Sequence, residues 1–380
     1  MNAVFSGSLG VPLVLTLDHA GVDKWGIAVF FVLWNLSGAA INLAPQRRLR
    51  AALGSSLILL LSSVAVFVGM LLLIFAFALP LAVVLSAAVL MAAYSVQYPI
   101  YLGRIVSSGE SGARVGSSMA SARRIWIFGY IAGLGAYSGV ALMGGAALQV
   151  PLVALAVTVV LQIVWRRVRE EPSSPPPHPS GDRFGGPRVR VTALVLLGVA
   201  ISLLRATDSL RSTYFPLYAQ HVGVTASVIS LLFVATAVSE LLVVRPLGRI
   251  GDRARSVTPL MLVAFVGACS MLLVAAGTSL WILITSQILY AFFTSGFQLF
   301  GVQRFVEATQ HAERGASLYQ GSLQIGGLVG ILLPLLIAGY GPGIFVVGAV
   351  LCATALVTLL LNARQGRKID AGRDRRHSHT

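Results

Sequence analysis

The chain has 380 residues, of which 56% are hydrophobic and only 11% are charged, and its formal net charge is +15. Soluble domains carry about 25% charged residues, so this composition excludes an ordinary soluble fold. Unbroken apolar runs such as 57–70 also exclude the short alternating strands of an outer-membrane barrel. We therefore predict an all-α membrane protein, because a helix satisfies its own backbone groups in lipid.

Twelve membrane spans are predicted in chain order. The first has about 16 residues, whereas a crossing helix needs roughly 20. Either the sequence begins inside the true first helix, or this helix lies shallow in the bilayer. The predicted spans cover residues 3–18, 25–44, 52–74, 80–103, 115–138, 146–165, 190–219, 225–247, 257–276, 280–303, 316–338 and 342–362.

Lysine and arginine in the short loops predict the sidedness of the chain. Alternate loops are rich in arginine, whereas the loops between them contain only Lys24. Because cytoplasmic loops carry the basic excess, both termini are predicted to be cytoplasmic, in a plasma (cell) membrane. This location also explains the positive charge without a nucleic-acid partner. The basic clusters are Arg47, Arg48 and Arg50; Arg104 and Arg114; Arg166, Arg167, Arg169, Arg183, Arg188 and Arg190; Arg245, Arg249, Arg253 and Arg255; Arg304 and Arg314; and Arg364 onward.

The sequence does not predict disulfide bonds or a cleaved signal peptide. The only cysteines, Cys269 and Cys352, lie in predicted spans, so we do not expect a disulfide framework. The N-terminus has neither a basic region nor a clear small-residue cleavage site, so we expect the first span to be retained.

A proline-rich segment divides the chain into two halves. Residues 170–187 include three consecutive prolines, which predict a solvated linker rather than packed structure. Residues before and after it repeat at a nearly constant offset, which indicates an internal duplication. We predict a six-helix half at 1–169, a cytoplasmic linker at 170–189, a six-helix half at 190–363 and a basic cytoplasmic tail at 364–380. The repeated pairs are Arg104/Arg304, Arg114/Arg314, Ser117/Ser317, Gln97/Gln298, Pro45/Pro246 and Ser37/Ser239.

The loop expected after the eighth span carries a recognisable signature, Gly-Arg-Ile-Gly-Asp-Arg-Ala-Arg at 248–255. It resembles the Gly-x-x-x-Asp-Arg loop of the major facilitator superfamily, with Gly248, Asp252, Arg253 and Arg255 as its members. An aspartate here can accept from a helix N-terminus or pair with an arginine, latching two helices together. The resemblance implies a gating loop that stabilises the outward-open state. The alternative is an ordinary basic anchoring loop, which is also how we interpret 45–50.

Within that superfamily, the chain is most similar to the sugar efflux transporters. The similarity rests on the segment at 1–7, on Asp208-Ser209-Leu210-Arg211 with the following Pro216-Leu217-Tyr218, and on Thr236-Ala237-Val238-Ser239-Glu240. It implies a fold of two six-helix bundles and a sugar-like substrate. At two positions implied to face the solute, Asp208 replaces asparagine and Arg211 replaces tyrosine.

Several charges lie inside predicted spans, where each costs about 2.5–3.5 kcal/mol and is usually functional. We predict Asp208 and Glu240 as proton-coupling sites. Arg123, Arg205 and Arg211 are predicted partners or solute binders, and Tyr214 shares the helical face of the last two. The alternative is a set of static helix-to-helix ion pairs.

Neutral polar residues in the spans predict a water-accessible cavity lined by Asn35, Gln97, Gln298 and Gln324. For any one of them, a hydrogen bond between helices is the alternative. Gly129-x-x-x-Gly133 and Gly326-x-x-x-Gly330 occupy matching spans of the two halves and predict close helix packing.

The sequence contains no nucleotide-binding loop and no hydrolase or metal-site motif, so neither an enzyme nor a cofactor nor a metal is predicted. Our leading hypothesis is a secondary transporter in the lipid bilayer that couples efflux of sugars or related small molecules to protons. A multidrug or secondary-metabolite exporter of the same fold, with a drug-like substrate, is the alternative. A membrane sensor or scaffold that moves nothing is the alternative from another class.

Overall fold

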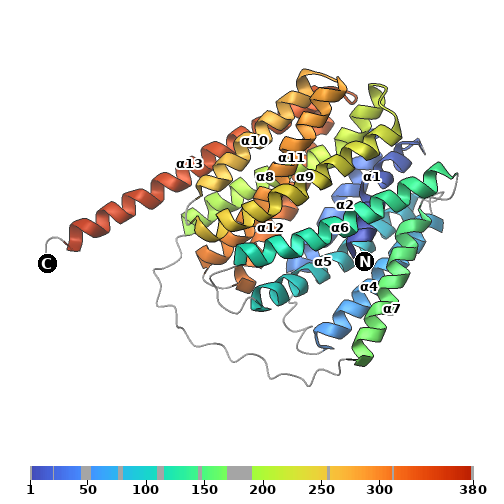
Figure 1. Cartoon of the computed structure of the whole chain (residues 1–380), viewed down its shortest axis with the longest axis horizontal. Coiled ribbons are helices and arrows are strands. Elements are labelled where there is room, and N and C mark those ends of the chain that lie inside the picture. The colour runs from blue at the N-terminus through green and yellow to red at the C-terminus, as the bar shows by residue number, and fades with distance from the viewer. Residues whose placement is uncertain are drawn as a thin grey trace.

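The computed structural model describes residues 2–19, 21–43, 53–75, 80–108, 115–143, 148–168, 191–254, 257–309 and 312–377. Within them the chain forms a bundle of twelve long α-helices and one 3-10 turn (Figure 1). The elements are α1 Asn2–His19, α2 Lys24–Leu43, α4 Ser55–Phe75, α5 Pro80–Ser108, α6 Val115–Leu142, α7 Gln149–Val168, α8 Val191–His221, α9 Ala226–Arg253, α10 Thr258–Ala276, α11 Leu280–Thr309, α12 Ala312–Leu332, η1 Leu333–Leu336 and α13 Gly343–His377.

Each predicted span coincides with one of these helices. In the described residues, nine helices are long and apolar enough to cross a membrane, and α1 and α5 contain shorter apolar stretches. The all-α membrane fold is therefore confirmed, whereas twelve crossings and the side on which each terminus lies stay predictions. The predicted linker at 170–189 lies outside the described residues.

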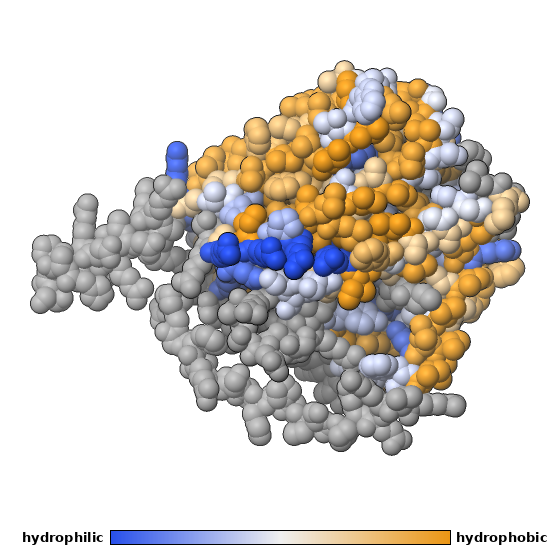
Figure 2. Space-filling view, in the orientation of Figure 1, coloured by the Kyte–Doolittle hydropathy of each residue, from blue (hydrophilic) through white to orange (hydrophobic). Residues whose placement is uncertain are grey.

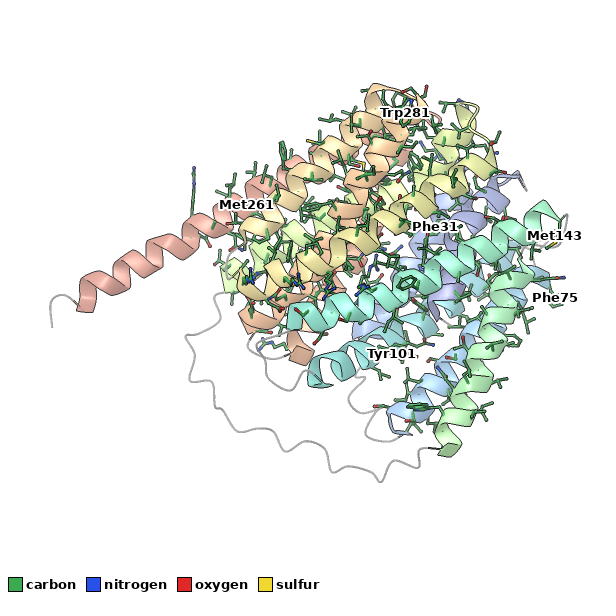
Figure 3. All side chains as sticks on the ribbon, viewed as in Figure 1. Phe31, Phe75, Tyr101, Met143, Met261 and Trp281 are labelled. Atoms are coloured by element: carbon green, nitrogen blue, oxygen red, sulfur yellow. The ribbon has the colours of Figure 1, made fainter. Side chains whose placement is uncertain are left out.

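The outer surface of the bundle is apolar, as a protein dissolved in lipid requires. Large hydrophobic side chains are exposed on its helices, and orange dominates the face shown in Figure 2. Phe75, Met143 and Trp281 are highly exposed at helix ends and point away from the bundle in Figure 3. A tryptophan at such an end, as Trp281 is, is typical of the membrane–water interface.

The first six helices, α1 to α7, and the last six, α8 to α13, repeat the same set of contacts. The contacts of α1 with α6, α2 with α5 and α4 with α5 reappear as α8 with α12, α9 with α11 and α10 with α11. We call these two sets the first half and the second half. They meet where α6 packs on α9 and α2 packs on α12, and we call this contact surface the seam.

Glycine pairs set the closest contacts inside each half. A Cβ at Gly133 would overlap the carbonyl of Val4 on α1, and one at Gly330 would overlap the carbonyl of Ala206 on α8. A Cβ at Gly129 would lie 2.7 Å from the Ala3 Cβ. These contacts are equivalent in the two halves, and they confirm the packing role predicted from the four-residue spacing.

Two segments differ from the prediction. The signature at 248–255 is helical through Arg253, where α9 ends, rather than a loop. Ala254 continues the ladder by donating to Ile250 O at 2.8 Å, and Arg253 in the last turn complements the helix dipole. The predicted tail at 364–380 is helical as far as His377, because α13 runs straight on and projects from the bundle (Figure 1). Arginine, lysine, glutamine and alanine in this segment are good helix formers.

We expect Gly133→Ala and Gly330→Ala to lower the thermal unfolding temperature of the purified protein in detergent. Overpacking of this kind costs about 1–3 kcal/mol. Gly135→Ala and Gly321→Ala are matched controls, since a Cβ at either position meets no atom within 4 Å. All four substitutions gain the same helix propensity, so only the overlap differs. Equal unfolding temperatures for all four variants would show that the close approaches do not stabilise the fold.

Candidate functional site

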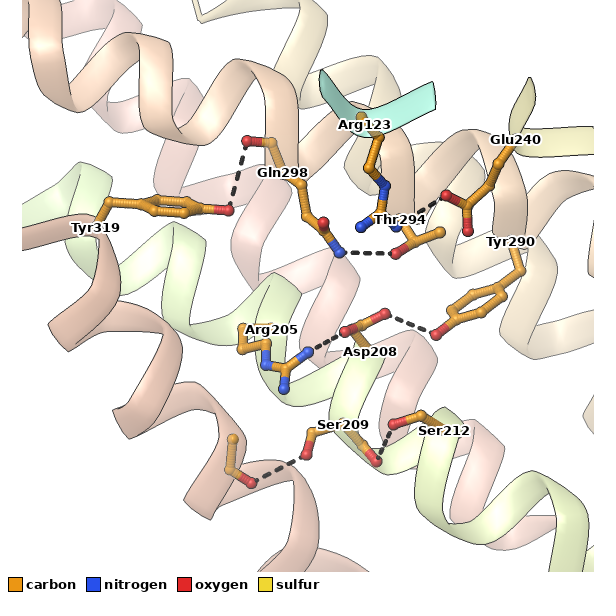
Figure 4. A network of polar contacts seen from close by, with 11 residues as sticks. Arg123, Arg205, Asp208, Ser209, Ser212, Glu240, Tyr290, Thr294, Gln298 and Tyr319 are labelled. Atoms are coloured by element: carbon orange, nitrogen blue, oxygen red, sulfur yellow. Dashed lines mark hydrogen bonds and ion pairs between the residues drawn. The ribbon is translucent and has the colours of Figure 1, made fainter. Parts of the chain in front are cut away.

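Asp208 lies in α8 and is the centre of a polar network in the second half (Figure 4). Asp208 is 5% exposed, and its carboxylate forms an ion pair with Arg205 one helical turn earlier. The hydroxyl of Tyr290 on α11 donates to Asp208 Oδ1 at 2.6 Å. The carboxylate is therefore held by a cation and a phenol, which together offset part of the cost of burying it.

Arg211 brings a second cation to the same tyrosine. Its guanidinium lies 4.5 Å from the centroid of the Tyr290 ring and 5.0 Å from that of Phe215. The side chain donates to the hydroxyls of Ser270 at 3.2 Å and Ser286 at 3.0 Å, and the residue is 1% exposed. Arg211 is thus packed among α8, α10 and α11, where cation–π contacts and hydroxyls replace water.

Glu240 on α9 forms an ion pair with Arg123 on α6, and this pair crosses the seam. Arg123 Nη2 lies 2.8 Å from Glu240 Oε2, and the Ser295 hydroxyl donates to the same oxygen at 3.3 Å. The Arg123 guanidinium also lies 4.4 Å from the Trp126 ring, which stacks on Tyr130. Glu240 is 7% exposed, so the two halves are joined by a largely buried charge pair.

Helix α11 connects both acidic residues. Tyr290 contacts Asp208, and Ser295 contacts Glu240. Thr294 and Gln298 follow Tyr290 at four-residue intervals and therefore share its face of the helix. The Gln298 amide donates to the Thr294 hydroxyl at 3.2 Å. One face of α11 thus carries a row of hydroxyl and amide groups beside the two carboxylates, as Figure 4 shows.

A second polar group lies at the seam between α2 and α12. A Cβ at Gly38 would lie 2.6 Å from Ser95 Oγ and 3.1 Å from Gln324 Nε2, so this glycine allows Gln324 to reach across the seam. In the same way, Gly327 leaves space for the side chain of Asn35. Among the described residues, Ser95 Oγ and Gln324 Oε1 are buried without a hydrogen-bond partner. Such atoms can bond to water or to a polar solute.

An aromatic pocket of about 150 Å³ lies beside this polar group, between α1, α2 and α5. Trp34 and Tyr94 line it and immediately precede Asn35 and Ser95 in the chain. The Tyr94 hydroxyl lies 3.3 Å from the Ser6 hydroxyl. Small-molecule pockets usually enclose about 300–1,000 Å³, so this volume accommodates one ring or a few waters. The complete lining is Phe5, Ser6, Leu9, Gly10, Leu13, Phe31, Trp34 and Tyr94.

Some predicted cavity residues lie in helix contacts instead. The Gln97 amide donates to Ser63 at 3.1 Å, between α5 and α4. The Tyr214 hydroxyl donates to the Ile331 carbonyl at 2.8 Å, between α8 and α12. Both residues are fully packed, as is Arg211, because a polar group in an apolar bundle is satisfied by the neighbouring helix. The other predicted residues fall into two groups. Asn35, Arg123, Glu240 and Gln324 lie at the seam, and Arg205, Asp208 and Gln298 belong to the network of the second half that Figure 4 shows.

The end of the bundle predicted to be cytoplasmic is closed by Asp252. Its carboxylate accepts from the backbone amide of Ser117 at 3.2 Å and from the Ser117 hydroxyl. Ser117 lies in the first turn of α6, where backbone amides have no intrahelical partner. Asp252 near the C-terminus of its own helix is electrostatically unfavourable, and the N-terminus of α6 compensates it. This contact has the form predicted for the signature, and it joins the two halves.

The other members of the signature have separate positions. Gly248 is buried and Arg253 is exposed, whereas Arg255 lies outside the described residues. Nearby, Gln303 Nε2 donates to Gly251 O at 2.8 Å, and Arg304 donates to Ala254 O. The C-terminal carbonyls of α9 are therefore bonded by α11, which fixes the turn that carries Asp252.

The opposite end of the bundle is closed by Lys24. This residue begins α2, and its ammonium donates to the carbonyls of Pro334, Ile337 and Gly339 at 2.7, 2.7 and 2.6 Å. It also lies 5.7 Å from the centroid of the Tyr340 ring. Burial, together with the Asp18 and Asp23 carboxylates, raises the pKa of Tyr340 to about 12, so the contact is with a neutral phenol. A lysine of the first half thus caps the carbonyl end of α12 and η1.

Several residues of the site were not assigned a role from the sequence. Trp126 follows Arg123 by three residues, a spacing that could have predicted the cation–π contact. The serines Ser95, Ser270, Ser286 and Ser295 gave no comparable signal, because serine is common in membrane helices. In the described residues, no three histidine, cysteine or acidic side chains are grouped as a metal site would need.

Comparisons with known proteins bear on this arrangement. The family described as Major Facilitator Superfamily matches residues 197–379. Among solved structures, the chain is similar to a mutant of the nucleoside transporter NupG, with a TM-score of 0.68 and 14% identity over 94% of this chain and 96% of that one. It is also similar to the Major Facilitator Superfamily transporter FucP in the outward conformation, with a TM-score of 0.61 and 11% identity over 95% and 98%. No curated protein matches the sequence.

The chain has the major facilitator fold. Both similarities extend over nearly the whole chain, so they include the seam and the helices that carry Asp208 and Glu240. The identities are low, and the similarity concerns the fold rather than the substrate.

We expect Asp252→Ala to increase hydrogen–deuterium exchange in the first turn of α6, residues 115–118. The substitution removes the acceptor of the Ser117 amide, which then becomes available to water. Ile250→Ala, at an exposed position two residues earlier on α9, is the control. If exchange in this turn were unchanged by Asp252→Ala, the carboxylate would not hold the two halves together.

We expect Arg123→Gln to destabilise the protein strongly, because it leaves Glu240 without its cation. Loss of one partner of a buried pair costs about 3–5 kcal/mol, and exposure of part of the Arg123 side chain reduces that figure here. The double variant Arg123→Gln/Glu240→Gln should recover a large part of the loss in thermal unfolding experiments. Additive losses in the double variant would refute an energetic coupling across the seam.

Proposed function

We propose that this protein is a secondary transporter that moves small polar molecules across the plasma membrane by alternating access. The observation that supports this most directly is the Arg123–Glu240 ion pair, which is made between the two halves of a major facilitator fold. An ion pair across the seam breaks or is rearranged when the halves rock against each other. The charge state of Glu240 is therefore linked to the conformation, which is the requirement for coupling.

We propose protons as the coupling ion. Glu240 and Asp208 are largely buried carboxylates, each beside a cation and each bonded to a hydroxyl on α11. When Arg123 leaves Glu240, burial favours the neutral carboxylic acid, and when it returns, the carboxylate is favoured. Proton uptake and release would then follow the opening of the seam to either side.

We infer the substrate class from two groups of side chains. The unpartnered Ser95 Oγ and Gln324 Oε1 suit a solute with many hydroxyls. In the neighbouring pocket, Trp34 and Tyr94 offer flat faces for a ring. Together with the resemblance to sugar efflux transporters, this favours sugars or related small molecules. The similarity to the nucleoside transporter NupG adds nucleosides to the compounds worth testing.

A multidrug exporter is the second candidate. Phe5, Phe31 and Trp34 make most of the pocket surface apolar and aromatic, a lining suited to flat lipophilic compounds. Export of lipophilic dyes by cells that overexpress the protein, without transport of labelled sugar or nucleoside in vesicles, would favour this candidate. No flux of any compound would favour the sensor or scaffold.

We expect proteoliposomes that contain the protein to accumulate labelled sugar when a pH gradient is imposed. Glu240→Gln and Asp208→Asn should abolish this accumulation and keep exchange of labelled for unlabelled substrate, because exchange needs no net proton movement. Asp23→Asn is the control, since Asp23 caps the Gly26 amide at 2.8 Å and asparagine caps equally well. Unchanged pH-driven accumulation in both carboxylate variants would contradict proton coupling at these residues.

A further inference from the structure

A row of arginines lies exposed along the end of the seam, where α9 meets α6. Arg245, Arg249 and Arg253 are spaced by four residues on α9 and therefore share one helical face, and Arg124 lies on α6. All four are exposed. Figure 2 shows a hydrophilic band over the adjoining ends of these two helices, with apolar surface above it.

This row has no acidic partner in the described part of the chain, where the ion pairs are those of Arg123, Arg205 and Arg304. Like charges one turn apart on a helix repel each other. Successive arginines on α9 are separated by about 6 Å along the axis, so their guanidinium groups can converge on one anion. Within the described residues, the positive charge of the row is therefore not compensated.

The position of the row along the helix matches the lipid headgroup region. From Ala226 to Val244, α9 measures about 28 Å and carries Glu240 alone as a charge, directed into the seam. The hydrocarbon core of a bilayer is about 30 Å thick, so Arg245 falls at its boundary. Arg249 and Arg253 then extend into the layer of phosphates.

Exposed apolar side chains continue from the row on the bilayer side. Leu242, one turn before Arg245, is 74% exposed, and Ile125 and Phe128 follow Arg124 on the exposed surface of α6. A phospholipid matches both parts, since its phosphate can bind the guanidinium groups while its acyl chains cover these side chains. A soluble anion would match the arginines alone.

We propose that the Arg124, Arg245, Arg249 and Arg253 row is a binding site for the headgroup of an anionic phospholipid. Arginine binds phosphate oxygens through two parallel hydrogen bonds, which makes it well suited to this role. Because Arg124 belongs to the first half and the other three to the second, one lipid would bridge the seam at its surface. The site does not depend on the proposed function, since binding requires no transport.

Native mass spectrometry of the purified full-length protein tests the proposal by titration with phosphatidylglycerol or with phosphatidylcholine. We expect tighter binding of phosphatidylglycerol. The variant Arg245→Gln/Arg249→Gln should weaken it by roughly 25-fold, since each basic residue near an anionic surface contributes about fivefold. Arg166→Gln/Arg364→Gln is the charge-matched control, because both residues are exposed on other helices, and it should bind as the native protein does.

A charge-keeping variant and a competition experiment complete the test. Arg245→Lys/Arg249→Lys keeps the charge and should bind phosphatidylglycerol much better than the glutamine variant, which separates loss of charge from misfolding. Glycerol phosphate carries the phosphate without acyl chains and should not compete. Equal binding of phosphatidylglycerol by the glutamine and control variants, equal binding of phosphatidylcholine, or competition by glycerol phosphate would each overturn the proposal.

Discussion

Charge inside a lipid-facing bundle has to be paired, and in this protein one largely buried pair is formed between the two halves rather than within one. Arg123 comes from α6 and Glu240 from α9. Neither residue can be exposed to hydrocarbon without a large cost, so any opening of the seam must provide water, a proton or a solute to the separated charges. The proposed function therefore links the conformation of the bundle to the charge state of its core.

The distribution of contacts is consistent with this link. Inside each half, glycines allow backbones to touch, as Gly133 does with α1 and Gly330 with α8. At the seam, the Arg123–Glu240 ion pair lies in the middle of α6 and α9, and polar contacts at the two ends of the bundle involve helix termini. Asp252 near the C-terminus of α9 is compensated by the N-terminus of α6, and Lys24 at the N-terminus of α2 is compensated by the carbonyls after α12. Each half is thus packed as a unit, and in the proposed function the polar contacts between the halves are the ones that are exchanged for water.

Much of this organisation could be predicted from the sequence because its signals are local. Apolar runs set the helices, the four-residue spacing of glycines predicts close packing, and an aspartate in a known signature indicates a helix-capping contact. The direction in which a side chain points depends on packing between segments far apart in the chain. Gln97 therefore binds Ser63 rather than lining a cavity, and the specific pairing of Arg123 with Glu240 could not be deduced. The helical end of α13 differs from the prediction because good helix formers continue beyond the apolar region. The end of α9 contains Pro246 and two glycines, and it stays helical because α11 bonds its last carbonyls.

The most direct test of a seam that opens with the charge state of its core is a distance measured across it. Spin labels at Ser121 on α6 and Ile250 on α9, both exposed, would report this distance by double electron–electron resonance in reconstituted protein. The account predicts two distance populations whose ratio changes with pH in the native protein and becomes insensitive to pH in Glu240→Gln. A single distance, unchanged by pH and by this substitution, would contradict it.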